Sequence, residues 1–324
     1  MNKPIVFMFS GQGSQYFGMG RELYQQDPIF RSWMRSCDKL LTPLLNTSLL
    51  DIIYPEQSGR GQMFDELLHT NPALLCIEYS LARLLMDMGL EPDYLVGYSF
   101  GEVTSAVLSG ALSLEQGLKL SVDFARVMKK DTPEAAMLAV ITSDSIMQEK
   151  PDLFRHCPLA GRNFSGSFVV SGLPGDIRQL QQELSHHQVM SQLLPVNHGF
   201  HSTLVAGAEK GIKHLTREVT LKPPKIPVIS AVTTRQVAEF DHDHFWQVLR
   251  YPVEFSRTVE RMLAQDDYVF IDAGPSGTLS TFVKYLLPQG SASEHYEVMN
   301  PFGRNMKTLE NLREQLQPVA KFAW

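Results

Sequence analysis

The feature that most constrains this chain is a serine held between two glycines, in the segment GYSFG at residues 97–101. Residues 92–96 form a short, mostly apolar run that predicts a buried strand, and residues 102–112 have the spacing of a helix. A serine at such a strand-to-helix turn is the nucleophile-elbow pattern, because glycines allow a turn that side chains would block. We therefore expect the Ser99 hydroxyl to be exposed at a strand end, with the Phe100 N–H and the positive helix N-terminus facing the same point.

Two further apolar runs end in glycine-rich turns. Residues 5–9 predict a central parallel strand that leads into SGQGSQ at 10–15, and residues 268–272 predict another that leads into AGPSG at 273–277. The first loop lacks the third glycine of a dinucleotide fingerprint, because Tyr16 stands there, and it lacks the lysine of a P-loop. Since ligands bind at the carboxyl ends of strands in open α/β sheets, the three turns predict one site at a shared sheet edge.

The character of the chain changes between residues 131 and 196. There the predicted order of strand, helix, strand, strand, helix and strand is that of a ferredoxin-like unit. We interpret 131–196 as a small subdomain inserted into a larger one, which consists of 1–130 and 197–324. The strands are predicted at 136–142, 158–164, 167–172 and 188–196, and the helices at 143–149 and 174–186.

Helices of the larger part have recognisable starts. The sequence Thr-Asn-Pro at 70–72 predicts the opening of a long buried helix, because a proline is tolerated in the first turn. Ser113 and Gln116 have the spacing of a capping box, which predicts a helix from there to about residue 130. The other elements are predicted as a strand at 226–232 and helices at 203–216, 241–265 (interrupted at 251–252) and 307–316.

Composition excludes several classes of function. The net charge of −6 over 324 residues gives no reason to expect a nucleic-acid partner, and no apolar run is long enough to span a bilayer. The chain begins without the apolar segment of a signal peptide. The cysteines at 37, 76 and 157 are too widely spaced for a disulfide framework or a metal site. We therefore expect a cytoplasmic protein that binds no membrane and no metal.

A serine nucleophile needs a base, because its hydroxyl is weakly nucleophilic at neutral pH. Most of the ten histidines lie in polar segments, but His201 follows Gly199-Phe200 where the chain re-enters the larger subdomain. We take His201 as the candidate base. An oxyanion hole needs two converging N–H groups, and Phe100 and Gln12 are the candidates. Glu254 could orient His201, and a backbone carbonyl would serve as well.

Seven segments, in order between about residues 4 and 290, carry a family resemblance. They are FSGQGSQ at 9–15, TNPAL at 70–74, GYSFGE at 97–102, Asn163, HGFH at 198–201, PVEF at 252–255 and GPSG at 274–277. In that order they resemble PGQGSQ, TQPAL, GHSxGE, an asparagine of the small subdomain, HAFH and two late motifs. The family is that of the malonyl-CoA:acyl-carrier-protein transacylases and polyketide-synthase acyltransferase domains.

This resemblance implies an α/β fold, with an α/β-hydrolase-like large subdomain built on a parallel sheet and a ferredoxin-like (βαββαβ) insert. It implies a dyad of Ser99 and His201 that takes an acyl group from an acyl-carrier-protein thioester, or from acyl-CoA, onto the serine. The N–H groups of Gln12 and Phe100 would form the oxyanion hole. A backbone carbonyl near PVEF would orient the histidine, so that Glu254 need not act through its side chain. No cofactor is implied.

The chain departs from the family where the acyl group would bind. The acyl pocket is predicted from Tyr98, Phe124, His198 and Phe200, with Asn163 as a supporting residue. Tyr98 replaces the usual histidine beside the serine, and Glu254 replaces a residue that is usually an amide or basic. Phe124 stands 25 residues after Ser99, where the family has an arginine that holds malonyl carboxylates. Arg126 lies two residues later, about 200° around a helix, and is expected to point away.

The loss of that arginine predicts a different substrate. A guanidinium binds a carboxylate through two parallel hydrogen bonds, and removing one partner of such a buried pair costs about 3–5 kcal/mol. That corresponds to roughly two to three and a half decades of affinity. We expect a pocket for neutral acyl groups and an enzyme that passes them to water. In this respect the chain resembles the proofreading acyl hydrolases of trans-acyltransferase polyketide pathways, which clear stalled acyl chains from carrier domains.

Three alternatives remain open at this stage. A shifted helix could bring Arg126 into the site, which would make the chain a malonyl transacylase. An acyltransferase for a neutral unit is a second possibility, and a catalytically silent carrier-binding module a third; the retention of Ser99 and His201 argues against the last. An acidic carrier protein would dock on a basic patch, for which the candidates are Arg126, Lys129, Lys130, Lys210 and Lys213.

Overall fold

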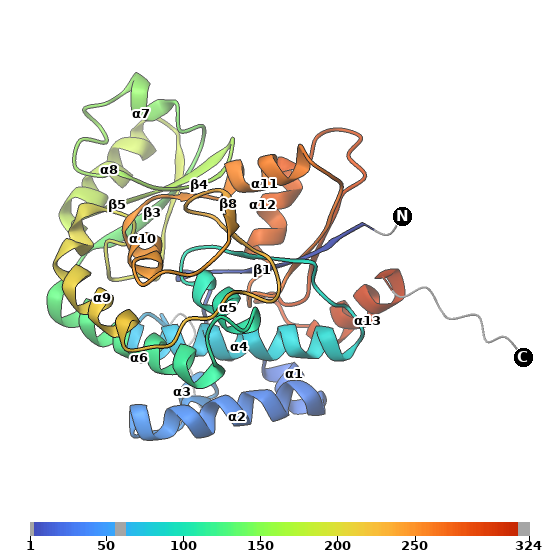
Figure 1. Cartoon of the computed structure of the whole chain (residues 1–324). Coiled ribbons are helices and arrows are strands. Elements are labelled where there is room, and N and C mark those ends of the chain that lie inside the picture. Colours follow the sequence, from blue (N-terminus) through green and yellow to red (C-terminus); the bar gives the residue numbers. More distant parts are fainter. Residues whose placement is uncertain (1–2, 56–62, 317–324) are drawn as a thin grey trace, which may run out of the picture.

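A computed structural model describes residues 3–55 and 63–316 (Figure 1). Its main sheet has six strands in the order β11-β10-β1-β2-β7-β8, and every neighbouring pair is parallel except β7 and β8. Strands from before residue 131 and from after residue 196 thus form one sheet, and the segment 131–196 that we predict to be inserted contributes no strand to it. Its strands are β1 (Ile5–Phe9), β2 (Tyr94–Gly97), β7 (Val228–Ser230), β8 (Arg235–Val237), β10 (Val269–Asp272) and β11 (Glu294–Glu297).

The central strand β1 is apolar throughout because both of its faces are covered. Side chains alternate across a strand, so Phe7 and Phe9 enter one core cluster and Val6 and Met8 enter another. Residue Met8 is paired with Asp272 of β10, and Phe9 is paired with Gly97 of β2. The three strands therefore end level with one another, and the prediction that their glycine-rich turns share one edge is confirmed.

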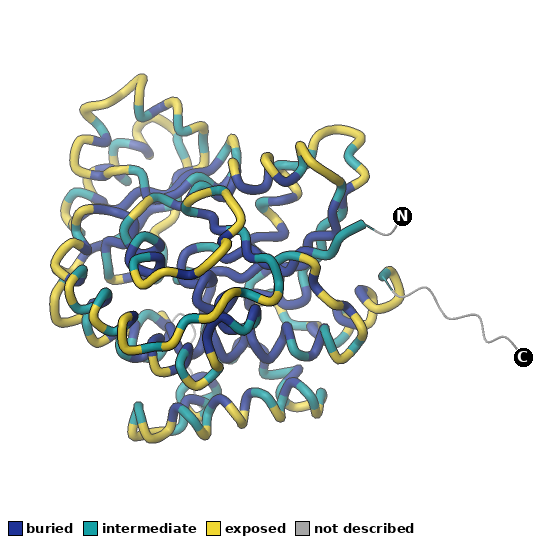
Figure 2. Tube along the Cα trace, viewed as in Figure 1, coloured by how far each residue is buried: buried dark blue, intermediate teal, exposed yellow. Residues whose placement is uncertain are grey.

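Helices cover both faces of this sheet (Figure 1). The first core cluster contains residues of α2, α4, α5 and α6, and the second contains residues of α11 and α12. Figure 2 shows that buried positions run along most of α4, whereas α2 is exposed along one side. The helices are α1 (Arg21–Gln26), α2 (Pro28–Leu45), α3 (Leu49–Ile53), α4 (Leu67–Asp87), α5 (Gly101–Leu108), α6 (Leu114–Asp131), the 3₁₀ helix η1 (Thr203–Ala208), α9 (Glu209–Arg217), α10 (His244–Arg250), α11 (Phe255–Leu263), α12 (Thr278–Leu286) and α13 (Asn305–Leu316).

A second sheet of five strands has the order β6-β3-β5-β4-β9. The first four pair antiparallel, and with α7 and α8 they reproduce the predicted ferredoxin-like order. The fifth strand, β9, comes later in the chain, between β8 and β10 of the main sheet, and it lies parallel to β4. The elements are β3 (Ala136–Ile141), α7 (Ile146–Glu149), β4 (Leu159–Phe164), β5 (Ser167–Gly172), α8 (Pro174–His186), β6 (Met190–Leu193) and β9 (Val253–Glu254).

Several helix boundaries differ from the sequence prediction, among them the start of α4 and the end of α5. The long helix α4 begins at Leu67 rather than at 70–72, so Pro72 lies inside it and one backbone hydrogen bond is lost there. Thr70 does not cap the helix, because its hydroxyl donates to the Gln12 side chain instead. Helix α5 ends at Leu108, earlier than predicted, whereas the capping box of Ser113 and Gln116 is confirmed. Within residues 3–55 and 63–316, no helix is long and apolar enough to cross a membrane.

Candidate active site

Ser99 occupies a sharp turn between β2 and α5. Its φ angle of 54° lies in the left-handed region, which is strained for a residue with a side chain. A Cβ atom added to Gly97 would lie 2.4 Å from the Glu102 nitrogen, and one added to Gly101 would lie 2.2 Å from the Phe9 oxygen. Both glycines are therefore required, because side chains there would collide with backbone. The turn has the backbone geometry expected of a nucleophile elbow, but Ser99 is buried rather than exposed as the sequence predicted.

His201 lies beside the serine, from the segment that leads out of the second sheet. Its Nε2 atom is 2.8 Å from Ser99 Oγ, and its Nδ1 atom is 2.8 Å from the Tyr251 carbonyl oxygen. Because a carbonyl can only accept, Nδ1 carries the proton and the Nε2 lone pair faces the serine hydroxyl. Burial lowers the pKa of His201 to about 4, although hydrogen bonds to backbone oppose that shift. The imidazole is therefore neutral at pH 7 and able to accept a proton.

The loop after β1 runs directly against the elbow. A Cβ atom on Gly11 would lie 2.9 Å from the Ser99 Cβ atom, so only a glycine allows this approach. The Gln12 side chain is held by α4, since Thr70 Oγ1 donates to its Oε1 at 2.9 Å and its Nε2 donates to Asn71 Oδ1 at 2.7 Å. In the described part of the chain, the backbone N–H groups of Gln12 and Phe100 donate to no protein acceptor. Both remain available for an oxyanion.

Two of the predicted supporting residues join different elements. The Tyr98 hydroxyl donates to Asn163 Oδ1 at 2.9 Å, which connects the elbow to β4 of the second sheet. Burial raises the pKa of Tyr98. Glu254 accepts from Arg162 Nη1 at 2.6 Å, and the Tyr251 carbonyl, not the Glu254 carboxylate, is bonded to His201. The backbone alternative for orienting the histidine is thus the one that the geometry shows.

A cavity of about 260 Å³ opens between the two sheets beside the elbow. One wall is the loop after β1, and the other is formed by strands of the second sheet and by α12. The lining combines hydroxyl and amide groups with apolar side chains, which suits an arm or chain that carries no charge. It includes Ser10, Gln12, Tyr98, Ala139, Ile141, Asn163, Ser167, Val169, Gln192, Leu194, Thr278 and Phe282.

The other predicted pocket residues lie elsewhere. Phe124 is 1% exposed and packs with its ring centre 6.3 Å from that of Phe245, so it does not line the 260 Å³ cavity. Phe200 is buried, and its ring lies 6.3 Å from that of His201. His198 lines a different cavity, and its Nδ1 atom is 3.1 Å from Thr132 Oγ1. Of the four, the structure brings only Tyr98 to the cavity beside the elbow, and a role for the others in acyl binding stays a prediction.

Glu102 joins the elbow helix to its neighbours through contacts that the sequence did not reveal. Its carboxylate is fully buried one residue after the elbow glycine. One oxygen accepts from Ser230 Oγ at 2.8 Å and from the Ala231 N–H at 3.0 Å, and the other lies 2.7 Å from His244 Nε2. It therefore fastens α5 to β7 and α10. In the sequence, the one indication of this role is a charged residue at the start of an otherwise apolar helix.

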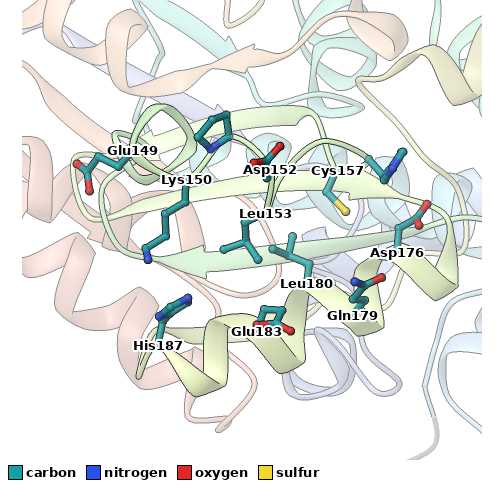
Figure 3. Close-up of a pocket in the computed structure, with 12 residues that line it drawn as sticks. Glu149, Lys150, Asp152, Leu153, Cys157, Asp176, Gln179, Leu180, Glu183 and His187 are labelled. Carbon is teal, nitrogen blue, oxygen red and sulfur yellow. The ribbon is translucent and has the colours of Figure 1, made fainter.

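A larger cavity, of about 500 Å³, lies in the second subdomain (Figure 3). It is lined by residues of 149–157 and by one face of α8, and it includes none of the residues described above. Burial raises the pKa of its one thiol, Cys157, to about 12, so that thiol is unreactive. In the part of the chain that the structure describes, no cluster of His, Cys, Asp and Glu could hold a metal. Size alone therefore does not identify the active site.

The fold and the elbow place the chain among the acyltransferases. Residues 6–321 match the acyl transferase domain family, and the chain belongs to that family. It is 36% identical to the polyketide biosynthesis acyltransferase homolog PksD of Bacillus subtilis, with 99% of each chain covered, and 37% identical to BaeD of Bacillus velezensis, with 98% of each covered.

Solved structures agree with this assignment. A loading acyltransferase from the avermectin modular polyketide synthase superposes with a TM-score of 0.88 at 25% identity, covering 96% of this chain and 99% of that one. The acyltransferase domain from the second module of the salinomycin polyketide synthase gives 0.86 at 26% identity, covering 98% of this chain and 75% of that one. The predicted α/β fold with a large and a small subdomain is thereby confirmed.

Proposed function

We propose that the chain is a hydrolase that removes neutral acyl groups from acyl-carrier-protein thioesters in polyketide biosynthesis. Ser99 Oγ attacks the thioester carbonyl carbon while its proton passes to His201 Nε2, 2.8 Å away. The N–H groups of Gln12 and Phe100 bind the oxyanion. When the C–S bond breaks, the leaving sulfur takes the proton from His201, and an ester remains on Ser99.

The second half repeats the same steps with water. His201 removes a proton from a water molecule, and the water oxygen attacks the ester carbon. The bond from the acyl carbon to Ser99 Oγ then breaks, and His201 gives its proton to Ser99 Oγ. A free carboxylic acid leaves. The lowered pKa of His201 supports this cycle, because the base is neutral before each attack and needs no prior deprotonation.

The observation that carries the choice of substrate is where α6 holds Phe124 and Arg126. Phe124, where the resemblance predicts an arginine, is buried against Phe245. Arg126 is held on the outside, since it donates to the Leu44 carbonyl at 2.6 Å and to Asp123 Oδ1 at 3.0 Å. Both contacts favour a site without a guanidinium for a malonyl carboxylate. They argue against the alternative in which Arg126 turns inward.

The relatives favour an acyl carrier protein as the partner. PksD and BaeD are named polyketide biosynthesis acyltransferase homologs, and an acidic carrier protein would meet the basic surface of α6 and α9. There Lys130 and Lys210 are exposed, while Lys129 pairs with Glu66 at 3.2 Å and Lys213 pairs with Glu209 at 3.0 Å.

The deciding experiment is intact-mass spectrometry of carrier proteins loaded separately with acetyl, a longer acyl chain or malonyl. We expect the neutral groups to be lost as free acids while malonyl is spared, and Ser99→Ala to abolish the loss. Transfer of malonyl from coenzyme A onto empty carrier protein would instead identify a malonyl transacylase. Arg126→Ala separates the two, because it would abolish malonyl transfer if Arg126 bound the carboxylate. It should leave the hydrolysis of a small acyl thioester, which needs no carrier docking, unchanged.

A further inference from the structure

Glu78 is a buried carboxyl group in the middle of α4 for which the acyl-transfer chemistry has no use. Its side chain is 0% exposed, and the helix around it is apolar. Among the described residues, no Lys, Arg or His forms an ion pair with it. Burying an unpaired carboxylate is strongly unfavourable, so its contacts must explain why it is there.

Those contacts reach both sides of the proposed oxyanion hole. Glu78 Oε1 lies 2.8 Å from Ser10 Oγ, and Glu78 Oε2 lies 2.7 Å from Thr104 Oγ1. Ser10 is two residues before Gln12 in the loop after β1, and Thr104 is one turn beyond Phe100 in α5. In Figure 1, α4 passes alongside α5. The two contacts of the carboxyl therefore connect α4 to α5 and to the loop after β1.

The hydroxyl groups beyond Ser10 continue as a chain. Ser10 Oγ is 2.8 Å from Ser14 Oγ, and Ser14 Oγ is 2.8 Å from the Gly11 carbonyl oxygen. These two contacts and the one to Glu78 are three hydrogen bonds in series. Three bonds need three protons, but the two serines supply only two, and the Gly11 carbonyl supplies none. A carboxyl that carries its own proton completes the series, from Glu78 through Ser10 and Ser14 to Gly11.

We propose that Glu78 is a positioning residue, held as a neutral carboxylic acid, whose proton fixes the loop that carries the Gln12 N–H. This inference rests on the proposed function to the extent that the loop serves as half of an oxyanion hole. Loss of the proton leaves the contact between Ser10 and Ser14 without a hydrogen bond, and the loop is then held less firmly. Thr104 donates to the second carboxyl oxygen in either state.

The surroundings of Glu78 agree with a retained proton. Burial raises its pKa to about 8, against the opposing effect of its contacts with the Thr104 and Ser10 hydroxyls. Asp272 of β10 adds to the rise, and burial raises the pKa of Asp272 itself to about 6. Glu102, the carboxyl group on α5, turns instead toward Ser230 and His244.

The test compares Glu78→Gln with Glu78→Leu. Glutamine keeps a donor toward Ser10 and an acceptor toward Thr104 at every pH, whereas leucine keeps neither. The readout is the rate at which a fluorophosphonate labels Ser99 between pH 5 and pH 10, since that reaction uses the same oxyanion hole and needs no natural substrate. We expect the wild-type rate to fall about tenfold above pH 8, Glu78→Gln to stay within about threefold of wild type at pH 7 without that fall, and Glu78→Leu to be at least about tenfold slower.

Thermal unfolding supplies a readout that does not depend on activity. A carboxyl whose pKa is raised in the folded state makes the protein less stable as pH rises from its unfolded value, about 4.3, to its folded value. Glutamine lacks this dependence. The melting temperature of Glu78→Gln minus that of wild type should therefore increase, on the order of 5 °C, between pH 5 and pH 9.

The outcomes separate this inference from the proposed function. Parallel melting curves at all pH values would show that Glu78 is ionised in the folded protein and would overturn the inference. If the melting temperature of Glu78→Gln rises relative to wild type as expected, but the labelling rate of wild type stays constant to pH 10, the positioning role would be overturned. No labelling of wild type at any pH, with the same gain in melting temperature, would support the neutral Glu78 and overturn the proposed function instead.

Discussion

The nucleophile side and the base side of this site are built in different ways. On the nucleophile side, Ser99 and the loop at Gln12 follow adjacent strands of the main sheet, and side chains of α4 hold the loop. On the base side, His201 lies in an irregular segment between the two sheets. Its ring is bonded to the Tyr251 carbonyl, and its own N–H donates to the Leu249 carbonyl at 2.8 Å.

The difference determines which substitutions each side can tolerate. The nucleophile side depends on the identity of particular residues. Some positions must be glycine, because a side chain there would collide with the backbone, and specific hydroxyl and amide groups must bond to one another. The base side depends on the path of the backbone, because a carbonyl oxygen is present whatever the residue. Substitutions should therefore damage the first side strongly and the second only where His201 itself is replaced.

The largest effect is expected at Gly101. In Gly101→Ala the new Cβ atom would lie 2.2 Å from the Phe9 carbonyl, which forces β1 and α5 apart. Overpacking of this kind costs about 3 kcal/mol or more, and activity should be lost with it. The measurement is urea unfolding, with Gly175→Ala as control, because no atom lies within 4 Å of a Cβ atom at Gly175. Equal stability of the two variants would contradict the role given to the elbow glycine.

A smaller effect on the same side is expected at Thr70. The isosteric change Thr70→Val removes the hydroxyl that donates to Gln12 Oε1 at 2.9 Å and leaves that oxygen without its donor. We expect about 1–2 kcal/mol of lost stability and roughly a tenfold lower kcat. Thr42→Val, the same change at an exposed position of α2, is the matched control and should alter neither. A Thr70→Val enzyme with wild-type kcat would show that the loop needs no anchor on α4.

The nucleophile side could be predicted from the sequence because its geometry requires particular residue types at particular positions. The elbow glycines, the loop after the first strand and the shared sheet edge all follow from local sequence. The start of α4 was placed wrongly for the same kind of reason, since Thr70 and Pro72 form a typical helix opening. Tertiary context overrode the pattern, because the Thr70 hydroxyl is used by Gln12 and the helix extends one turn earlier.

The base side could be predicted only in part. His201 was identified from its position, but a carbonyl partner has no side-chain signature, so Glu254 was a reasonable candidate on charge alone. Its carboxylate is bound to Arg162 instead. The short strands β8, β9 and β11 also escaped prediction, because two to four residues show little periodicity and their pairing depends on distant partners. The surroundings of Phe124 likewise depend on packing that spacing along one helix does not reveal.

The pH dependence of the reaction tests the base side next. Because burial holds the pKa of His201 near 4, the neutral base is the form present at neutral pH, and protonation should stop the reaction only in more acidic solution. We expect kcat/KM to be flat from pH 7 to about 5 and to fall about tenfold per pH unit below 4. Stopped assays between pH 3.5 and 7, with circular dichroism to confirm folding, would measure this. A limb near 6.5, the ordinary value for histidine, would mean that the ring is open to solvent.

The smallest effects are expected from the side chains beside His201. In Tyr251→Ala the carbonyl that binds His201 Nδ1 is retained, and the lost ring is 50% exposed, so kcat should change less than about twofold.

Glu254→Gln loses the half-buried ion pair with Arg162 and should cost at most about 1 kcal/mol of stability, again with little change in kcat. His201→Gln, by contrast, should remove at least about three decades of activity, because among the described residues only the His201 side chain bonds to Ser99 Oγ. If Glu254→Gln lost activity comparably to His201→Gln, the carboxylate would be acting on the histidine, and the distinction between a side-chain-built and a backbone-built half of the site would fail.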